Sequence, residues 1–353
     1  MIVGKHNIGN NYPTYFIADI AANHDGNLNK AIDLINLAAE AGANVAKFQH
    51  FKAPKIVSDY GFKNLDNLSS HQSGWKKSVY ETYKDASLPD EWTKLLIDEC
   101  KKAQIEFFSS PYDYESVDLL NAHNVKAHKI GSGDITWLEM IEYIAKLNKP
   151  IFIATGASDL NDVKRAMNLL DNFDIPVCVM QCNTNYTGSM DNFKFINLNV
   201  LKKYKDLFPN AILGLSDHTP GHTTVLGAVT LGARVIEKHF TDDNNKLGPD
   251  HGFSLNPKTW REMIDATREL ELSLGIQEKK IEENEVETVV LQRRSIRLKS
   301  DLEAGHTINI NDLSYLRPAP NDSIPPYDFD KIIKKKLKVK KTFGDYVKLD
   351  DFK

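Results

Sequence analysis

The chain has 353 residues, 41% of them hydrophobic, which is enough to bury a sizeable core in one large domain and a small one. The net charge of −4 is small and basic residues are interspersed with acidic ones, which argues against a nucleic-acid or membrane-surface partner. No segment is apolar enough for a membrane span or a signal peptide, so we expect a cytoplasmic protein.

Short apolar or β-branched runs alternate with longer amphipathic stretches, which predicts parallel strands joined by helices. We expect eight strands, at residues 15–20, 43–48, 105–110, 126–131, 150–155, 175–181, 211–216 and 233–240. A helix over 27–42 would begin at the cap Asn27 and end at Gly42, and another would span 88–104. Eight such units in about 250 residues favour a (β/α)8 TIM barrel, of class α/β, over a doubly wound sheet.

The remaining segments suggest further features outside the alternating pattern. Residues 50–87 are too long for an ordinary βα connection and predict a lid or an interface segment. After a barrel over 1–275, the charged stretch 276–290 predicts a linker and 291–353 a small second domain. Within that domain, 298–313 and 340–352 show a weak internal duplication. The lysine-rich segment 331–341 predicts an exposed helix leading into an edge strand.

The three cysteines form an odd set that suits a reducing compartment. They are Cys100, Cys178 and Cys182. Cys178 and Cys182 lie four residues apart on a predicted strand, which is poor evidence for a zinc site. We expect ordinary buried thiols.

Polar side chains follow every predicted strand at its C-terminal end, where barrel enzymes carry their reactive groups. In chain order they are Asp19, Lys47, Gln49, Ser109, Ser110, Lys129, Ser132, Asp134, Thr155, Asn183, Asn185, Tyr186, Ser216, His218, Glu237 and His239. Loops begin at strand ends, so some polar residues are expected there in any barrel. Lysines pointing into the mouth are less expected, because a buried ammonium needs compensation.

Two pairs of these residues suggest a chemistry. Lys47 and Lys129, near serines and Gly-rich turns, are suited to an anionic ligand such as a phosphate or a carboxylate. His218 and His239 each end a strand, in "LGLSDHTPGH" and "ARVIEKHFTDD". A lone histidine beside a strand is usually structural, but two at matched positions near carboxylates favour a divalent metal with open coordination positions. Their spacing is not a strict metal motif.

A series of motifs runs in order through the whole predicted barrel and resembles the sialic acid synthase family. The motifs are "FIADIAANHDGNLNKA", "AKFQ", "FFSSPYD", "HKIGSGDIT", "ATGAS", "GLSDHTPG", "RVIEKHFT" and "GPDH". The terminal segments "RRSIRLKSDLEAG" and "LRPAPND" resemble that family's antifreeze-like domain, of the β-clip type. The resemblance covers nearly the full chain.

The resemblance implies a carbon–carbon bond-forming transferase. Such an enzyme condenses phosphoenolpyruvate with the aldehyde of an N-acetylated amino sugar, and it releases phosphate and a nine-carbon 2-keto acid. The acceptor would be N-acetylmannosamine or a 2,4-diacetamido-trideoxy hexose, and the product would feed surface glycan biosynthesis. The resemblance further implies a divalent metal, Mn²⁺ with Mg²⁺ or Co²⁺ as alternatives, and a domain-swapped homodimer.

The resemblance also implies roles for individual residues. Asp19, Asp134, Lys47 and Lys129 would be catalytic. The residues that bind phosphoenolpyruvate would be Lys47, Ser110, Lys129, Ser132, Asn183, Thr184 and Ser216. The sugar would contact Asp19, Gln49, Tyr186, Asp250 and, from the partner's small domain, Arg317. His218 and His239 would bind the metal.

The sequence departs from the family pattern near the substrate. Asp19 and Asp134 stand where the family has glutamate, which is longer by one methylene, about 1.5 Å. Ala154 replaces a serine, and no proline follows Tyr186. Thr184 stands where asparagine or serine is expected.

Two other functions remain open on the residues alone. One is a Schiff-base aldolase of a keto-sugar acid, in which Lys47 or Lys129 attacks a carbonyl without a metal. The other is a non-catalytic sugar-binding protein. Neither a GxxxxGK[ST] motif nor a GxGxxG after a strand is present, which disfavours kinase and dehydrogenase functions.

Overall fold

The chain folds into two compact units in a computed structural model that describes residues 1–65, 72 and 75–353. The first unit is Met1–Gly275 and the second is Ile276–Lys353. Over the residues described, no helix is both long enough and apolar enough to cross a membrane.

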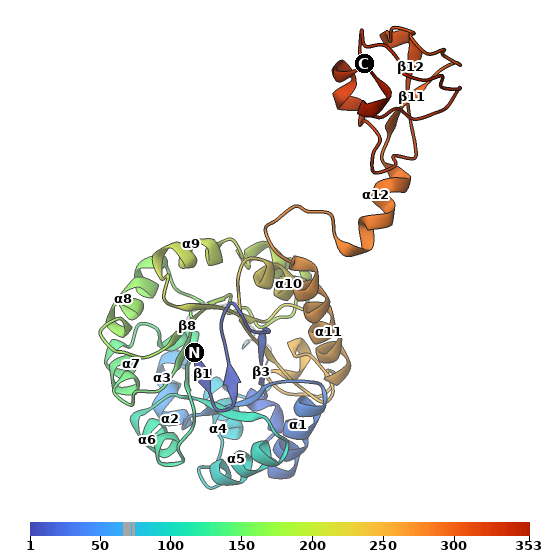
Figure 1. Cartoon of the computed structure of the whole chain (residues 1–353). Helices are drawn as coiled ribbons and strands as arrows, with labels where there is room; N and C mark the ends of the chain where they lie inside the picture. The colour runs from blue at the N-terminus through green and yellow to red at the C-terminus, as the bar shows by residue number, and fades with distance from the viewer. Residues whose placement is uncertain (66–71, 73–74) are drawn as a thin grey trace. The chain divides into compact units, whose positions relative to one another are not determined.

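Eight parallel strands form a barrel in the first unit (Figure 1). They are β3 (Tyr15–Asp19), β4 (Val45–His50), β5 (Glu106–Pro111), β6 (His128–Ile130), β7 (Ile151–Ala154), β8 (Val177–Cys182), β9 (Ile212–Asp217) and β10 (Val235–His239). The strands pair in the order β5-β4-β3-β10-β9-β8-β7-β6, and the two outermost, β5 and β6, lie side by side. The predicted TIM barrel is confirmed, with a strand in each of the eight predicted positions.

A helix follows each strand and covers the outside of the barrel (Figure 1). These helices are α1 (Leu28–Glu40), α5 (Trp92–Lys102), α6 (Tyr114–Ala122), α7 (Leu138–Ala145), α8 (Leu160–Leu170), α9 (Val200–Leu207), α10 (Thr223–Thr230) and α11 (Pro257–Leu274). Helix α1 begins as predicted, because the Asn27 side chain accepts a hydrogen bond from the Lys30 amide. It ends at Glu40, two residues before Gly42.

The strands alternate between two apolar layers, because successive side chains of a strand point to opposite faces. Outward residues such as Phe16 and Phe48 pack against the helices. Inward residues such as Ile17, Phe108 and Phe152 fill the barrel itself. The N-terminal hairpin β1 (Ile2–Val3) and β2 (His6–Asn7) adds apolar side chains to this inner layer. The apolar filling leaves only the C-terminal ends of the strands free for polar groups.

The described part of the segment after β4 contains three short helices, which the weak periodicity of the sequence did not indicate. They are α2 (Ala53–Ile56), α3 (Asp59–Lys63) and α4 (Val79–Ala86). Helix α4 has a capping box in which Ser78 and Glu81 bond each other's backbone amides. Residues 66–71 and 73–74 of the predicted lid lie outside the described residues.

Short 3-10 turns occur in both units. In the first unit they are η1 (Ala21–His24), η3 (Ser132–Asp134), η4 (Met190–Phe195) and η5 (His251–Phe253), in the loops after β3, β6, β8 and β10. The second unit contains η6 (Glu283–Glu285), η7 (Ile310–Asp312), η8 (Pro326–Lys331) and η9 (Leu349–Asp351).

The second unit has its own apolar core around an antiparallel strand pair. The pair is β11 (Ser295–Leu298) and β12 (Leu313–Leu316), and helix α12 (Val286–Gln292) precedes it. The core includes Ile296, Ile308, Ile324, Ile332 and Val347. The predicted start of the second domain, Leu291, falls inside α12.

The weak duplication of the sequence corresponds to a repeated local structure. Gly305 and Gly344 have φ of +87° and +82°, and each is followed three residues later by a buried aliphatic side chain. In each copy a 3-10 turn, η7 or η9, then follows. The aspartate at its end, Asp312 or Asp351, accepts a hydrogen bond from the amide of the residue just before the turn.

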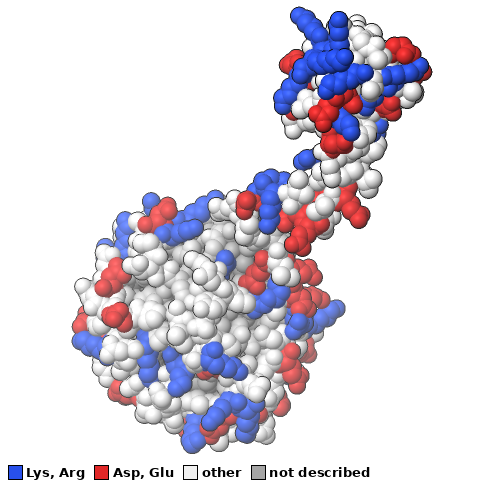
Figure 2. Space-filling view, viewed as in Figure 1, with Lys and Arg blue, Asp and Glu red and all other residues white. Residues whose placement is uncertain are grey.

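The lysine-rich segment 331–341 does not form the predicted helix. It forms a turn, with Lys334 at a φ of +66°, and then isolated β-bridges. Three apolar side chains of the segment, Ile332, Ile333 and Leu337, belong to or pack on the core, and their spacing is set by that packing. Most of its lysines are exposed, and Figure 2 shows basic side chains gathered on this unit.

The positive φ of Gly344 predicts a cost for any side chain there. We expect Gly344→Ala to lower the free energy of unfolding by about 1–2 kcal/mol, because an L-residue in this region brings Cβ close to the following carbonyl. Gly344→Asn should cost less, since asparagine tolerates this conformation. Thermal unfolding of wild type and the two variants measures their order of stability. An alanine variant as stable as wild type would contradict the prediction.

Candidate active site

The C-terminal ends of all eight strands enclose a polar cavity of about 340 Å³, called here the inner cavity. It is lined by Asp19, Lys47, Gln49, Ile56, Tyr83, Ser110, Tyr112, Lys129, Gly131, Ser132, Gly133, Asp134, Ala154, Cys182, Tyr186, Ser216, His218, Glu237 and His239. Every predicted site residue except Asn183, Thr184, Asp250 and Arg317 therefore lies at one place. Strand ends from distant parts of the sequence meet there because parallel strands share one direction.

Two lysines lie at the bottom of the inner cavity, and each is only 2% exposed. Nζ of Lys47 lies 2.6 Å from Oδ2 of Asp19 and 3.8 Å from Oε1 of Glu237. Nζ of Lys129 lies 3.5 Å from the same oxygen of Glu237. The Ser216 hydroxyl donates a hydrogen bond to that oxygen at 3.1 Å. Glu237 is thus shared between the two ammonium groups.

These carboxylates keep Lys47 charged in spite of its burial. Burial disfavours the ammonium, but the charges of Asp19 and Glu237 outweigh this and raise the pKa of Lys47 above 10.5. The charge of both lysines, expected from the sequence to be compensated by a ligand, is thus compensated in part by the protein's own carboxylates.

Several hydrogen-bond donors remain available to an anion. Lys129 donates to the Ile130 carbonyl at 3.1 Å, which leaves further ammonium protons. The buried Ser110 hydroxyl has no hydrogen-bond partner within the described chain. The Ser132 hydroxyl accepts a bond from the Gly156 amide at 3.0 Å and also bonds the side chain of Cys182. The group can bind a phosphate or a carboxylate.

His218 and His239 lie together, with ring centroids 5.3 Å apart. Nδ1 of His218 is 2.8 Å from the Asn183 carbonyl oxygen, so this nitrogen carries a proton and donates it to that oxygen. Nε2 is left for other partners. Nδ1 of His239 is buried without a hydrogen-bond partner among the residues described. Burial, together with the charges of His218 and Lys47, places the pKa of His239 well below 6.5, so this imidazole is neutral.

The histidine pair fits a metal with an incomplete protein ligand set. Within the described part of the chain, no group of three or more His, Cys, Asp or Glu side chains could hold an ion. The two imidazoles would supply two ligands, and the carbonyl bond to Nδ1 of His218 is the support that metal-bound imidazoles usually have. Burial disfavours the charged form of His218, but its contact with Cys182 raises its pKa, so an ion would displace a proton there.

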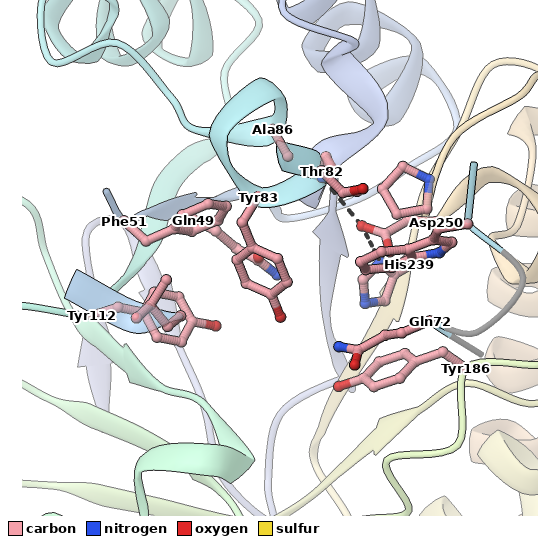
Figure 3. Close-up of a pocket in the computed structure, with 14 residues that line it drawn as sticks. Gln49, Phe51, Gln72, Thr82, Tyr83, Ala86, Tyr112, Tyr186, His239 and Asp250 are labelled. Carbon is pink, nitrogen blue, oxygen red and sulfur yellow. Dashed lines mark hydrogen bonds and ion pairs between the residues drawn. The ribbon is translucent and has the colours of Figure 1, made fainter. Parts of the chain in front are cut away.

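A second pocket, of about 160 Å³ and called here the outer pocket, adjoins the inner cavity. It is lined by Ala22, Gln49, Phe51, Ile56, Gln72, Trp75, Thr82, Tyr83, Ala86, Tyr112, Tyr186, His239, Pro249 and Asp250. Figure 3 shows the hydroxyls of Tyr83, Tyr112 and Tyr186 pointing towards its middle. Burial raises the pKa of Tyr112 well above 10, so its hydroxyl stays a neutral donor.

Two aspartates have pKa values close to neutrality. Burial raises the pKa of Asp134 to about 6, although Lys129 opposes the shift. Burial also raises the pKa of Asp250 to about 6, against a bond from the Ala22 amide. Oδ2 of Asp250 lies 3.8 Å from Nδ1 of His239. Both carboxyl groups can exchange protons near pH 6.

Four predicted site residues lie elsewhere. Among the described residues, Asn183 and Thr184 do not line the inner cavity, and the Asn183 amide bonds the Phe195 carbonyl at 3.4 Å. The backbone carbonyl of Asn183 accepts the bond from Nδ1 of His218. Asp250 lines the outer pocket. Arg317 is an exposed residue of the second unit.

Some residues of the site were not assigned from the sequence. Glu237 was noted as a polar strand end without a role, although its inward position, two residues before His239, was a usable signal. Tyr83 and Tyr112 reach the site from α4 and from the loop after β5. Tyr112 lies in the motif "FFSSPYD" but received no role there, and no sequence pattern indicated Tyr83. All three cysteines are buried as expected, and Cys182 also lines the cavity.

A barrel with its charged groups gathered at the C-terminal mouth is the architecture of an enzyme. Comparison with known proteins agrees. Residues 34–279 match the profile of the NeuB family. The chain is 37% identical over 318 residues to the N,N'-diacetyllegionaminic acid synthase of Campylobacter jejuni, which covers 89% of this chain and 93% of that protein.

Two further matches agree with the family profile. The pseudaminic acid synthase of Helicobacter pylori is 30% identical over 310 residues, 87% of this chain and 88% of that protein. The crystal structure of the N-acetylneuraminic acid (sialic acid) synthetase of Leptospira borgpetersenii has a TM-score of 0.71 at 27% identity, covering 82% and 94% of the chains. The chain belongs to the NeuB family, and the predicted resemblance of its barrel is confirmed.

The raised pKa of Asp134 predicts how stability depends on pH. Its carboxyl titrates at about 6 in the folded protein, whereas an unperturbed aspartate titrates at 3.8, so ionisation costs stability as pH rises from about 4 to 6. Asp134→Asn avoids this cost, and we expect it to be more stable than wild type by about 1–3 kcal/mol at pH 8. The difference should be smaller at pH 5, as thermal melts at both pH values would show. A variant less stable at pH 8 would disprove the burial argument.

Proposed function

We propose that the protein is a nonulosonic acid synthase. It would condense phosphoenolpyruvate with the open-chain aldehyde of an N-acetylated amino sugar, giving a nine-carbon 2-keto acid and phosphate. The observation that supports this most is the gathering of two buried ammoniums, serine hydroxyls and a histidine pair in one cavity. The family membership supports the same reaction.

The donors at the bottom of the cavity are suited to phosphoenolpyruvate. Lys47, Lys129, Ser110, Ser132 and Ser216 would hold its phosphate and carboxylate groups. Glu237 keeps both ammoniums in place before the substrate arrives, so little reorganisation is needed when it binds.

The carboxyl groups would orient the sugar and move protons. Asp134 has a pKa near 6 and can act as a general acid or base near neutral pH. Asp19 is bound to Lys47 and lies 3.5 Å from Nε2 of His239, at the point where the sugar aldehyde would enter. Gln49, Tyr186 and Asp250 would contact the rest of the sugar from the outer pocket.

We propose that His218 and His239 hold a divalent ion, Mn²⁺ or in its place Mg²⁺ or Co²⁺. When bound, it would act as a Lewis acid on the aldehyde oxygen during attack by the enol carbon. The neutral state of His239 and the carbonyl support of His218 suit this use.

The acceptor that the pocket favours is a 2,4-diacetamido-trideoxy hexose, with N-acetylmannosamine as the other candidate. Phe51, Ile56, Trp75 and Ala86 give the outer pocket an apolar part that suits acetamido and deoxy methyl groups. The relative of 37% identity is named for a diacetylated product, which points the same way.

The two alternative functions have less support. A Schiff base requires a neutral amine, and the carboxylates around Lys47 hold it as an ammonium. A non-catalytic sugar-binding protein would not need two buried lysines and two carboxyls with pKa values near 6.

For the second unit we propose the antifreeze-like domain, of the β-clip type, that the terminal motifs suggest. Arg317 would reach the sugar of a partner subunit in a domain-swapped homodimer. Its exposed side chain is available for such a contact. We further propose that the enzyme works in the cytoplasm and supplies surface glycan biosynthesis.

Phosphate release from phosphoenolpyruvate tests the proposed reaction. We expect turnover in the presence of Mn²⁺ with at least one member of a panel containing N-acetylmannosamine and 2,4-diacetamido-trideoxy hexoses, and loss of turnover with EDTA. Reactions without acceptor serve as the blank. The acceptor assignment fails if no sugar supports release, and borohydride trapping with pyruvate would favour the aldolase instead.

Removal of one imidazole tests the histidine pair. We expect His239→Ala to lose Mn²⁺ binding and at least about 100-fold in activity, because a ligand itself is removed. Circular dichroism should show an unchanged fold. His123→Ala, at the end of α6 and away from both pockets, is the matched control. Full activity of the His239 variant would remove this residue from the site.

A further inference from the structure

A buried ion pair lies on the outer side of the barrel wall directly behind the two histidines. Asp217 precedes His218 at the end of β9, and Lys238 precedes His239 in β10. Asp217 and Lys238 are paired in the register of the two strands. They are 2% and 1% exposed, and the Lys238 ammonium contacts the Asp217 carboxylate directly. Alternation along the strands turns them away from the inner cavity.

The pair is embedded in a buried hydrogen-bond network. Besides the contact with Lys238, Oδ2 of Asp217 accepts bonds from the hydroxyls of Thr219 at 2.8 Å and Thr224 at 2.7 Å. Lys238 also donates to the Thr219 carbonyl at 2.6 Å. Thr224 belongs to α10 and Thr219 to the loop that leads to it. The network therefore ties β9, β10, this loop and α10 together.

Packing alone does not explain charges at this position. Each ion costs several kcal/mol to bury, and an apolar pair of similar size is often as stable or more stable. What an ion pair adds is a specific alignment, because its geometry fixes one register between neighbouring groups. The two groups aligned here are the residues immediately before His218 and His239.

We propose that Lys238 and Asp217 are positioning residues for the imidazoles of His218 and His239. The pair fixes the positions of the ends of β9 and β10 relative to each other along the barrel axis. Thr219 and Thr224 fix the direction in which the chain leaves β9. The rings are thereby presented to one divalent cation. This inference rests on the proposed metal site, but it concerns residues that contact neither the ion nor a substrate.

Mn²⁺ titration of the full-length protein without substrates tests the inference. The main variant is Lys238→Met combined with Asp217→Leu, which removes both charges and leaves neither unpaired. We expect its Kd for Mn²⁺ to rise at least about tenfold, as when other supporting residues of metal ligands are removed. Its affinity for phosphoenolpyruvate without metal should stay unchanged, since Lys47 and Lys129 are untouched.

Thr93→Val is the matched control, because it removes one buried hydrogen bond, to His50, at the distant β4–β5 side of the barrel. It should bind Mn²⁺ like wild type even if its melting temperature falls. If the double variant does not fold, Thr224→Val replaces it, with an expected rise in Kd of about threefold for one lost hydrogen bond. A folded variant with the wild-type Kd would overturn the positioning role alone. Wild-type protein that binds no Mn²⁺ would overturn both the metal site and this inference.

Discussion

Two ammonium groups are held next to each other, out of contact with solvent, at the mouth of the barrel. This arrangement depends on Glu237, which lies within 4 Å of both, and on Asp19, which bonds Lys47. Without these carboxylates, desolvation would drive at least one lysine to its neutral form. The anion-binding part of the site depends on this charge balance. With both lysines charged, Lys129 and the Ser110 hydroxyl keep hydrogen-bond donors for a ligand in the cavity.

The barrel separates its stabilising part from its reactive part along its own axis. Phe108, Phe152 and Val235 fill the inside of the strands, and the N-terminal hairpin adds further apolar side chains. The strand ends above this layer carry groups that cost stability, including Asp134 with its pKa of about 6. Such groups can be kept where an apolar core nearby supplies the stability.

Alternation along β9 and β10 gives each of these strands two polar faces. Ser216, Glu237 and His239 point into the cavity, while Asp217 and Lys238 point outwards into a network with α10. A strand of a barrel is normally apolar on its outer face, as Phe16 and Phe48 are. Asp217 and Lys238 depart from this pattern as a charged pair, and they directly precede the two histidines, which is why we connect them with the function.

The sequence by itself determined the barrel, because the alternation of apolar runs and amphipathic stretches depends only on local periodicity. It also placed Lys47, Lys129 and His239 at strand ends, and parallel strands bring all such ends to one rim.

The sequence could not show that Glu237 is shared by two lysines, since the spacing of residues along the chain does not give distances across a barrel. It could not place Tyr83, which reaches the site from a segment with weak periodicity. The helix predicted over 331–341 does not form, because packing of Ile332 and Leu337 in the second unit's core overrides the local pattern. Tertiary structure alone decided which polar groups meet, and those meetings set the charges and pKa values on which the chemistry depends.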